Sequence, residues 1–315
     1  MSYQQITSEE RYTISTLRKQ GYSVARIAQY LERHRSSIYR EIQRNQCNDG
    51  RYRPFKADSR TRGRRRETRR KWYFSDIQLQ MVIALVRLDW SPEQVSGWLK
   101  KHNILSISHS TIYRYVWYDY CYLGTLYTHL RQANKKRRKR HNSPDSRGVL
   151  PGKRHISERP LSAENRSRIG HWEIDTVMGS DDRHCIVTLV ERKTKYTLIA
   201  KLKCRTTKEL NKAVIRLIKK QHRPVRTITA DNGTEFHGFK DIEDKTGTLF
   251  YFATPHHSWE RGLNENTNGL IRQYLPKGKS MAHITQKDCD AIATTLNRRP
   301  RKSLNYKTPE QCYAN

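Results

Sequence analysis

Residues 229–272 read TADNGTEFHGFKDIEDKTGTLFYFATPHHSWERGLNENTNGLIR, and this stretch decides the fold. A β-branched run, Val225 to Thr229, leads into Asp231, and a second apolar run follows at Leu249 to Thr254. The polar stretch after it has the composition of a helix and carries Glu265, with 33 residues between the two acids. The pattern predicts one carboxylate at the end of a strand and one on a helix.

An earlier strand-like segment, HWEIDTVMG, supplies a third carboxylate, Asp175, with 55 residues between it and Asp231. Attack on a phosphodiester places negative charge on the attacking and leaving oxygens, and two Mg²⁺ ions about 3.5–4 Å apart stabilise both. Mg²⁺ prefers hard oxygen ligands and keeps several waters, so a few carboxylates suffice. We therefore expect Asp175, Asp231 and Glu265 to be the catalytic residues and metal ligands. Mg²⁺ is the expected cofactor, with Mn²⁺ as a substitute.

Three motifs together resemble a known family. They are DNG at 231–233, SWERGLNENTNGLIRQYLPKG at 258–278, and GHWEID at 170–175. They are similar to those of insertion-sequence transposases of the IS-thirty type, in the wider group of DDE transposases and retroviral integrases. The resemblance covers almost the whole chain, as far as TPEQ at 308–311. It implies a polynucleotidyl transferase with a ribonuclease-H-like catalytic domain.

The resemblance also suggests roles for two arginines. In the wider group an Arg stands four residues before the glutamate and a basic residue seven after it, and Arg261 and Arg272 match. Both are candidates for gripping DNA phosphate. The chain departs from the group at Ser258, where a Tyr is frequent, and at Ile174, where the family commonly has Gly. Neither departure removes an expected metal ligand.

Each acid taken alone has a plainer interpretation. Asp231-Asn232-Gly233 is a good turn signal, and Glu265 by itself would be a solvated helix residue. The order, spacing and flanking motif favour the triad. Five further acids lie nearby in the sequence, and one of them, Glu235, could orient a metal ligand: Glu173, Asp181, Asp182, Glu235 and Glu260.

The composition of the 315 residues indicates the class of partner. A net charge of +32 and a pI near 10.2 favour a polyanion, and double-stranded DNA is the expected one. No run approaches ~18 consecutive apolar residues, so we expect no membrane span, and no secretion signal begins the chain. Six scattered cysteines form no C-x-x-C pair, which suits a reducing cytoplasm. We expect a cytoplasmic, nucleoid-associated bacterial protein that uses no nucleotide cofactor.

Residues 1–50 predict a helix-turn-helix domain. SVARIAQYLERHRSSIYREIQRN reads as two short helices, with Ser23 capping the first and Glu32 where the usual turn Gly would stand. The second helix would enter the major groove of DNA. Its expected DNA contacts are Arg35, Ser36, Ser37, Tyr39, Arg40 and Arg44.

Residues 76–130 predict a second helix-turn-helix-like domain. Ser91, Pro92 and Gln94 form a capping-box pattern, and Ser108 can cap the helix that follows. The expected DNA contacts here are His109, Ser110, Thr111, Tyr113 and Arg114. Basic linkers are expected at 51–75 and 131–160; residues 51–72 contain 11 Lys or Arg and two acids.

Residues 161–315 predict the catalytic domain. Three successive strand patterns, at 171–179, 184–194 and 196–204, suit an antiparallel meander. An amphipathic helix at 207–222, a strand at 225–232, a helix near 239–245, a strand at 249–254 and helices from about 263 and 285 follow. This order resembles the ribonuclease-H-like, integrase-type fold of the family. The expected fold is an α-helical helix-turn-helix region followed by an α/β domain of that type, with a mixed five-stranded sheet. The resemblance implies that its first and fourth strands are neighbours.

We expect a transposase that binds the terminal inverted repeats of its own element. It would release a 3′-hydroxyl at the element end and transfer that end to target DNA, acting as a homodimer or a larger assembly. Two alternatives stay open at this point. A DNA-binding regulator or inactive copy would need only the helix pairs, and a ribonuclease-H-like nuclease would cut without joining.

Overall fold

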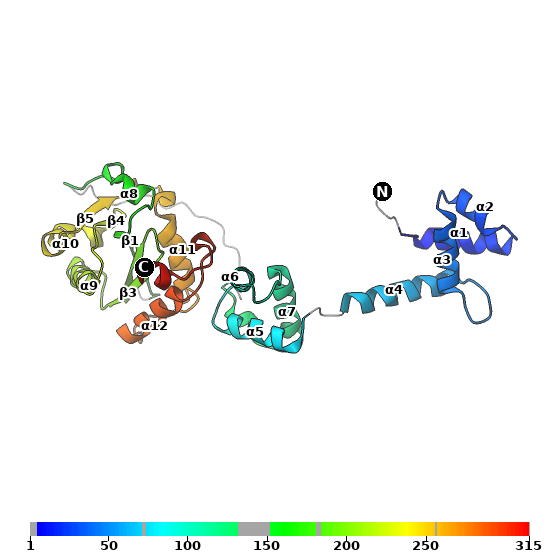
Figure 1. Cartoon of the computed structure of the whole chain (residues 1–315). Helices are drawn as coiled ribbons and strands as arrows, with labels where there is room; N and C mark the ends of the chain where they lie inside the picture. The colour runs from blue at the N-terminus through cyan, green and yellow to red at the C-terminus, as the bar shows by residue number, and fades with distance from the viewer. Residues whose placement is uncertain (1–4, 71–73, 132–151, 181–183, 256, 315) are drawn as a thin grey trace. The chain divides into compact units, whose positions relative to one another are not determined.

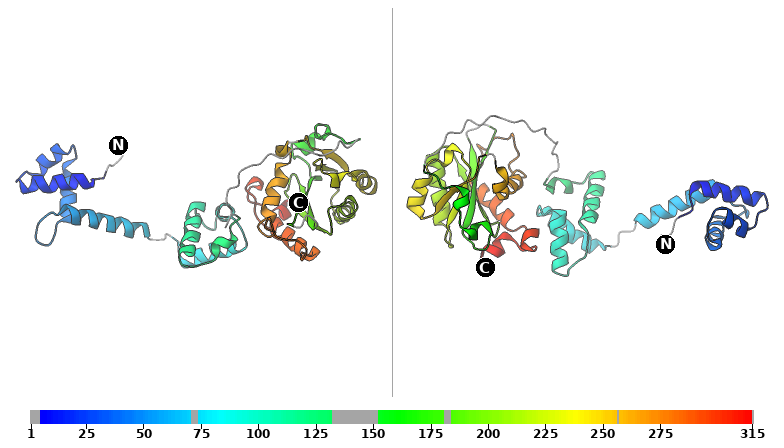
Figure 2. Two further views of the ribbon diagram at one scale, coloured as in Figure 1. Left: turned by 180° about the vertical axis from the view of Figure 1, so that it is seen from behind. Right: turned by 90° about the horizontal axis from the view of Figure 1, so that it is seen from above.

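The computed structural model describes residues 5–70, 74–131, 152–180, 184–255 and 257–314. The chain divides into two compact units, Met1–Asp76 and Ile77–Asn315, which Figures 1 and 2 colour from blue to red along the sequence. The other domain boundaries predicted above stay predictions. Within the described ranges, none of the helices combines the length and the apolar character needed to cross a bilayer.

In the N-terminal unit, the described residues 5–70 form α1 (Ser8–Lys19), α2 (Val24–Tyr30), α3 (Arg35–Asn45) and α4 (Pro54–Arg70). Thr7 and Glu10 form a capping box at the start of α1, and the Ser23 side chain accepts a hydrogen bond from the backbone of α2. Glu32, in the turn between α2 and α3, has a φ of 50°. A non-glycine residue therefore adopts the left-handed conformation that the turn requires.

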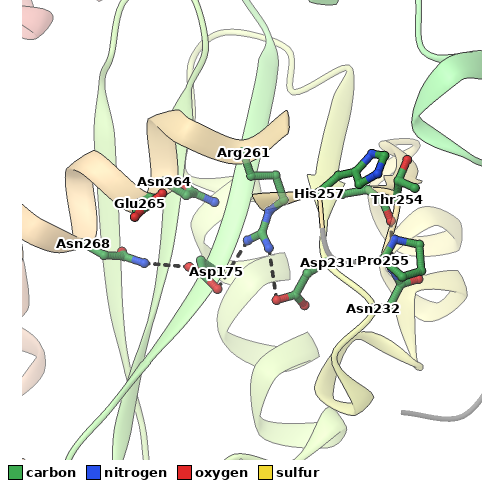
Figure 3. A pocket seen from close by; sticks show the side chains of 11 residues that line it. Asp175, Asp231, Asn232, Thr254, Pro255, His257, Arg261, Asn264, Glu265 and Asn268 are labelled. Carbon is green, nitrogen blue, oxygen red and sulfur yellow. Dashed lines mark hydrogen bonds and ion pairs between the residues drawn. The ribbon is translucent and has the colours of Figure 1, made fainter. Parts of the chain in front are cut away.

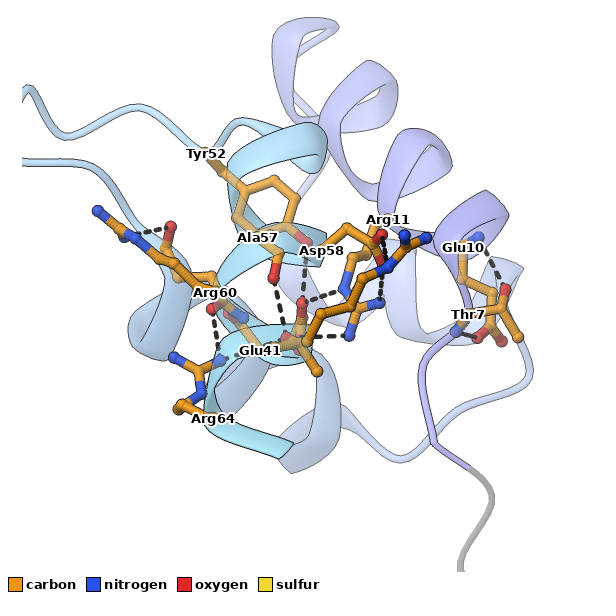
Figure 4. Close-up of polar contacts among 12 residues, drawn as sticks. Thr7, Glu10, Arg11, Glu41, Tyr52, Ala57, Asp58, Arg60 and Arg64 are labelled. Atoms are coloured by element: carbon orange, nitrogen blue, oxygen red, sulfur yellow. Dashed lines mark hydrogen bonds and ion pairs between the residues drawn. The ribbon is translucent and has the colours of Figure 1, made fainter. Parts of the chain in front are cut away.

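Helix α4 occupies most of the segment that the sequence predicts to be a basic linker, and α1 and α3 hold it in place. Ala57 is fully buried against them. Arg11 of α1 forms ion pairs with Glu41 of α3 at 2.8 Å and Asp58 of α4 at 3.0 Å (Figure 4). Because these buried charges are paired, the first turns of α4 belong to the helix-turn-helix unit.

The described residues 74–131 form α5 (Asp76–Arg87), α6 (Pro92–Lys101), α7 (His109–Cys121) and the short 3₁₀ turn η1 (Leu126–His129) at the start of the second unit. Ser91 and Gln94 form the predicted capping box at α6, and Ser108 caps α7. The side chains of Ile83, Val116 and Leu126 share a small core. The predicted pair of capped helices is therefore present.

A polar network joins these helices to the rest of the second unit. Asp89 accepts hydrogen bonds from the Tyr274 hydroxyl at 2.8 Å and is paired with His129 at 2.8 Å and Arg299 at 3.4 Å. The side chain of Arg299 is only 2% exposed. One carboxylate at the α5–α6 turn therefore connects the helices to the C-terminal part of the chain.

A five-stranded mixed sheet forms the centre of the second unit: β1 (His171–Met178), β2 (Cys185–Glu191), β3 (Thr197–Leu202), β4 (Thr227–Ala230) and β5 (Leu249–Phe252). The strand order is β3-β2-β1-β4-β5. The first three strands are antiparallel neighbours, whereas β4 runs parallel to both β1 and β5. This confirms the predicted meander and the pairing of the first and fourth strands.

Helices cover both faces of the sheet (Figure 1). Their bounds, with the short 3₁₀ turns, are η2 (Ile156–Glu158), α8 (Leu161–Glu164), α9 (Thr207–Lys219), η3 (Thr234–Phe236), α10 (Phe239–Thr246), η4 (Ser258–Arg261), α11 (Gly262–Ile271), α12 (Gln286–Asn297), η5 (Lys302–Leu304) and α13 (Pro309–Ala314). Trp172 and Ile174 pack with α9 and α10, whereas Val177 packs with α11 and α12. Side chains alternate along a strand, so Glu173 and Asp175 lie on the face that α11 covers.

Candidate active site

The three predicted carboxylates line one pocket of about 320 Å³. Asp175 comes from β1, Asp231 directly follows β4, and Glu265 lies in the first turn of α11 (Figure 3). The pairing of β1 with β4 and the packing of α11 on the sheet bring together residues that are far apart in the sequence. The pocket wall also includes Thr254, Pro255, His257, Arg261, Asn264 and Asn268.

Asp175 is held from two sides. Its Oδ1 accepts a hydrogen bond from the backbone N–H of Thr176 at 2.9 Å, and its Oδ2 accepts one from the Asn268 side chain at 2.6 Å. Burial raises the pKa of Asp175 above its ordinary value; the charge of Arg261 opposes this rise and that of Asp231 adds to it. The carboxylate is thus fixed in orientation on β1, the central strand of the sheet.

Asp231 is both a turn residue and part of the pocket wall. Its Oδ1 accepts a hydrogen bond from the backbone N–H of Gly233 at 2.8 Å, the local contact typical of an Asp at a turn. The second oxygen faces the pocket and pairs with Arg261. The turn interpretation of this motif and its role in the pocket are therefore compatible.

Glu265 has an exposed side chain in the first turn of α11. A negative charge at this end of a helix is favoured by the helix dipole. Among the described residues, no three His, Cys, Asp or Glu side chains stand close enough together to hold one metal ion as they are. The pocket still suits a hard divalent cation, because its three acidic side chains offer carboxylate oxygens as ligands. Two of these carboxylates already pair with a positive group, the guanidinium of Arg261.

Arg261 lies between the first two carboxylates. Its Nη2 is 3.3 Å from Asp175 Oδ1, and its Nη1 is 3.0 Å from Asp231 Oδ2. Nη2 also donates to the carbonyl oxygen of Ile174. The side chain is only 10% exposed. Burial alone would lower the pKa of Arg261, but the two carboxylates raise it above its ordinary value. Arg261, which the sequence predicts to bind DNA phosphate, thus forms ion pairs with two carboxylates of the protein.

Arg272, the other predicted phosphate-gripping residue, donates to the carbonyl oxygens of Met178 at 2.9 Å and Leu275 at 3.4 Å. These bonds tie the end of α11 to the end of β1. Contact of Arg261 or Arg272 with DNA stays a prediction.

The neighbouring acids have other partners. Glu173 is buried, pairs with Arg192, and accepts a hydrogen bond from the backbone N–H of Asn264 at 3.3 Å. Glu235 is buried and accepts three hydrogen bonds from Arg205, at 2.7, 2.8 and 3.0 Å. Each of these two acids is thus neutralised by an arginine, and neither lines the pocket.

One of the three remaining acids lies within the described residues. Glu260 accepts from the backbone N–H of Thr254 at 2.8 Å and so fixes the loop after β5. Asp181 and Asp182 lie outside the described residues.

Two asparagines of the pocket were missed by the sequence analysis. Asn264 and Asn268 are four apart, so they lie on the same side of α11. The side-chain oxygen and nitrogen of Asn264 are buried without a partner among the described residues. The repeated asparagines of NENTN were a signal for this polar helix face, but the sequence did not tell which one contacts Asp175.

The N-terminal unit carries a basic groove of about 870 Å³. Three helices and the preceding segment line it: Gln5 and Ile6, Arg11 of α1, Ser37, Arg40, Glu41 and Arg44 of α3, and Thr61, Arg64 and Arg65 of α4. Of the other predicted contacts on α3, Arg35 and Tyr39 are exposed and Ser36 is half-buried. The predicted recognition helix and the segment expected to be a linker therefore face the same groove.

On α7, His109, Ser110, Tyr113 and Arg114 are exposed and Thr111 is half-buried. The Thr111 hydroxyl contacts that of the capping Ser108 at 2.9 Å. The predicted DNA-facing residues of the second helix pair thus remain accessible, and their contact with DNA stays a prediction.

Comparison with known proteins adds independent information. Residues 2–45 match the family described as helix-turn-helix domain, and residues 165–258 match the integrase core domain. The second match includes Asp175 and Asp231 but ends before Glu265. In a search of solved structures, the catalytic core domain of BIV integrase was found with a TM-score of 0.37 and 16% identity, covering 46% of this chain and 93% of that one.

Curated relatives cover nearly the whole chain. The transposase for insertion sequence element IS4351 of Bacteroides fragilis is 39% identical over 97% of this chain and 94% of its own length. The transposase InsI for IS30A of Escherichia coli strain K12 is 37% identical over 97% of this chain and 82% of its own. The transposase for IS1086 of Cupriavidus metallidurans is 34% identical over 99% of this chain and 95% of its own. With this identity along its whole length, the chain belongs to the IS30 family of insertion-sequence transposases.

Proposed function

We propose that this protein binds the terminal inverted repeats of its own insertion sequence and catalyses divalent-metal-dependent 3′-end cleavage followed by strand transfer to target DNA. The observation that carries the proposal is the convergence of Asp175, Asp231 and Glu265 on one pocket. Their order along the chain and the helix-turn-helix unit before them support it.

Asp175, Asp231 and Glu265 would hold the metal ions, with Mg²⁺ preferred and Mn²⁺ as a substitute. When bound, such ions supply Lewis-acid stabilisation of the charge that develops on the phosphoryl, attacking and leaving oxygens. Asn268 keeps the Asp175 carboxylate oriented through its 2.6 Å hydrogen bond. The Gly233 backbone N–H does the same for Asp231. These residues limit the freedom of the ligands before substrate arrives.

Recognition of DNA would come mainly from the N-terminal unit. The exposed face of α3 would read base edges, and the arginines of α4 that line the same groove would contact phosphate. The second helix pair, through α7, would bind either the element ends or the target. Because two ends must be joined to one target, the active form would be a homodimer or a larger assembly on DNA.

The test uses purified full-length protein with a plasmid that carries the element's inverted repeats, in the presence of Mg²⁺, Mn²⁺ or EDTA. Wild type is compared with Asp231→Asn, Glu265→Gln and the control Asp244→Asn, which removes an exposed carboxylate on α10. We expect joined ends and new insertions only from wild type and the control, and only with a divalent metal.

Other results would favour the alternatives. Cleaved ends without any joined product would support a nuclease. If no variant gives product while all of them shift repeat DNA in a gel, the protein is a DNA-binding regulator or an inactive copy.

A further inference from the structure

We propose that Arg261 acts as an internal cation of the active site, and that a divalent metal ion must displace it in order to bind Asp175 and Asp231 together. The inference rests on the proposed function, because it concerns the same carboxylates. It adds a role in metal binding to a residue that the sequence assigns only to DNA.

The position of the guanidinium carries the inference. Arg261 uses two different nitrogens for two carboxylates that come from neighbouring strands, at 3.3 Å from Asp175 and 3.0 Å from Asp231 (Figure 3). A metal ion shared by the two aspartates needs one oxygen from each. A cation between two carboxylates is the arrangement that such a site requires, and here the cation belongs to the chain.

The hydrogen bonds of the two carboxylates show for which oxygens Arg261 and a metal ion would compete. Asp175 Oδ2 accepts from the Asn268 side chain, and Asp231 Oδ1 accepts from the Gly233 backbone. Asp175 Oδ1 also accepts from the Thr176 backbone at 2.9 Å, a contact that leaves room for a further cation at the same oxygen. Arg261 pairs with the other oxygen of each carboxylate. Arginine and metal therefore compete for the same pair of oxygens, and a positive guanidinium left in place would repel the incoming cation.

Arg261 has to move, because a guanidinium does not lose its proton in a protein. The residue stands where η4 ends and α11 begins, and it is followed by Gly262, where an added Cβ would meet no atom within 4 Å. Its buried Nε has no hydrogen-bond partner among the described residues. A DNA phosphate entering the pocket would offer the displaced guanidinium a new anionic, bidentate partner.

The consequence is a coupling between the two ligands of the site. DNA that takes over the guanidinium frees the carboxylates for metal, and metal that displaces the guanidinium makes it available to DNA. Because linkage is reciprocal, each ligand should raise the affinity for the other. Without DNA, the internal cation would keep the metal affinity of the wild type low.

The experiment measures Mn²⁺ binding to the full-length protein from the electron paramagnetic resonance signal of the free ion, with and without a random-sequence DNA duplex. Arg261→Gln is compared with wild type and with Arg298→Gln, which removes one positive charge from an exposed ion pair with Glu310. We expect Arg261→Gln to bind Mn²⁺ about tenfold more tightly than wild type in the absence of DNA. We also expect DNA to raise the Mn²⁺ affinity of wild type and of Arg298→Gln more than that of Arg261→Gln.

Two further variants make the result decisive. Arg261→Lys keeps the positive charge but has a single ammonium in place of the guanidinium, so its Mn²⁺ affinity should lie between those of wild type and Arg261→Gln. If the Gln variant does not fold, the Lys variant provides the test. Equal or weaker Mn²⁺ binding by the folded Arg261 variants would overturn the inference, because Arg261 would then only position the carboxylates. Asp231→Asn tests the site itself: if it binds Mn²⁺ as wild type does, the proposed metal site fails, whatever Arg261 does.

Discussion

The buried ion pair between Glu173 and Arg192 gives the sharpest prediction about stability. The side chains are 1% and 4% exposed, and the Glu173 carboxylate also accepts the backbone N–H of Asn264 in the first turn of α11. Replacing Glu173 by Gln keeps the shape of the side chain but leaves the Arg192 guanidinium charged and buried. The Glu173→Gln substitution therefore tests the effect of the lost charge while the packing stays the same.

Removing one partner of a buried ion pair costs about 3–5 kcal/mol of unfolding free energy, since the remaining charge stays desolvated. Arg192 keeps its bond to the Ala163 carbonyl and Gln can still accept, so we expect about 3 kcal/mol. For a folded unit of this size that corresponds to a loss of about 6–12 °C in Tm. Burial already lowers the pKa of Arg192, a sign that desolvation acts on it.

Thermal unfolding followed by circular dichroism measures the effect, with urea unfolding as a second method. Glu310→Gln is the matched control, because the ion pair of Glu310 with Arg298 is exposed and should contribute at most about 1 kcal/mol. A double variant, Glu173→Gln with Arg192→Met, should recover much of the lost stability. If Glu173→Gln stays within 1 kcal/mol of wild type, the pair is not the desolvated contact described here.

Four further outcomes follow from the structure. Burial, aided by nearby arginines, lowers the pKa of His171 to about 4 from about 6.5. Below pH 6.5 the unfolded chain therefore binds a proton that the folded chain does not. Between pH 7 and pH 5, wild type should lose about 2 kcal/mol more unfolding free energy than His171→Gln, measured by urea unfolding. Arg11→Met leaves two carboxylates without their shared cation, so we expect about 2–4 kcal/mol of destabilisation and faster hydrogen exchange within residues 5–70 but not in the second unit. Gly63→Ala should stabilise α4 by about 0.5–1 kcal/mol, because the added Cβ meets open space. Gly97→Ala should destabilise the folded protein by about 1–3 kcal/mol in the same unfolding assay, because the added Cβ would lie 1.9 Å from the Tyr306 ring.

Local sequence was sufficient for most of the secondary structure. The capping box at α6 and the amphipathic pattern of α9 are properties of neighbouring residues, so they were found without the fold. The order of elements in the catalytic part and the triad of acids also came from the sequence, aided by the resemblance to a family. The helix at α4 was missed, because its charge hides the few side chains, such as Ala57, that the helix-turn-helix unit buries.

The sequence, with the family resemblance, was enough to predict most of the helices and strands and to propose that three carboxylates form one site. Only the tertiary structure decided how each charge is used. Glu173, two residues from Asp175 on the same face of β1, is neutralised by Arg192, whereas Asp175 faces the pocket. Arg261 sits between two aspartates rather than in solvent. The physical reason is that pairing of charges depends on distance in space, which the register of β1 with β4 and the packing of α11 set, and no local pattern encodes that distance.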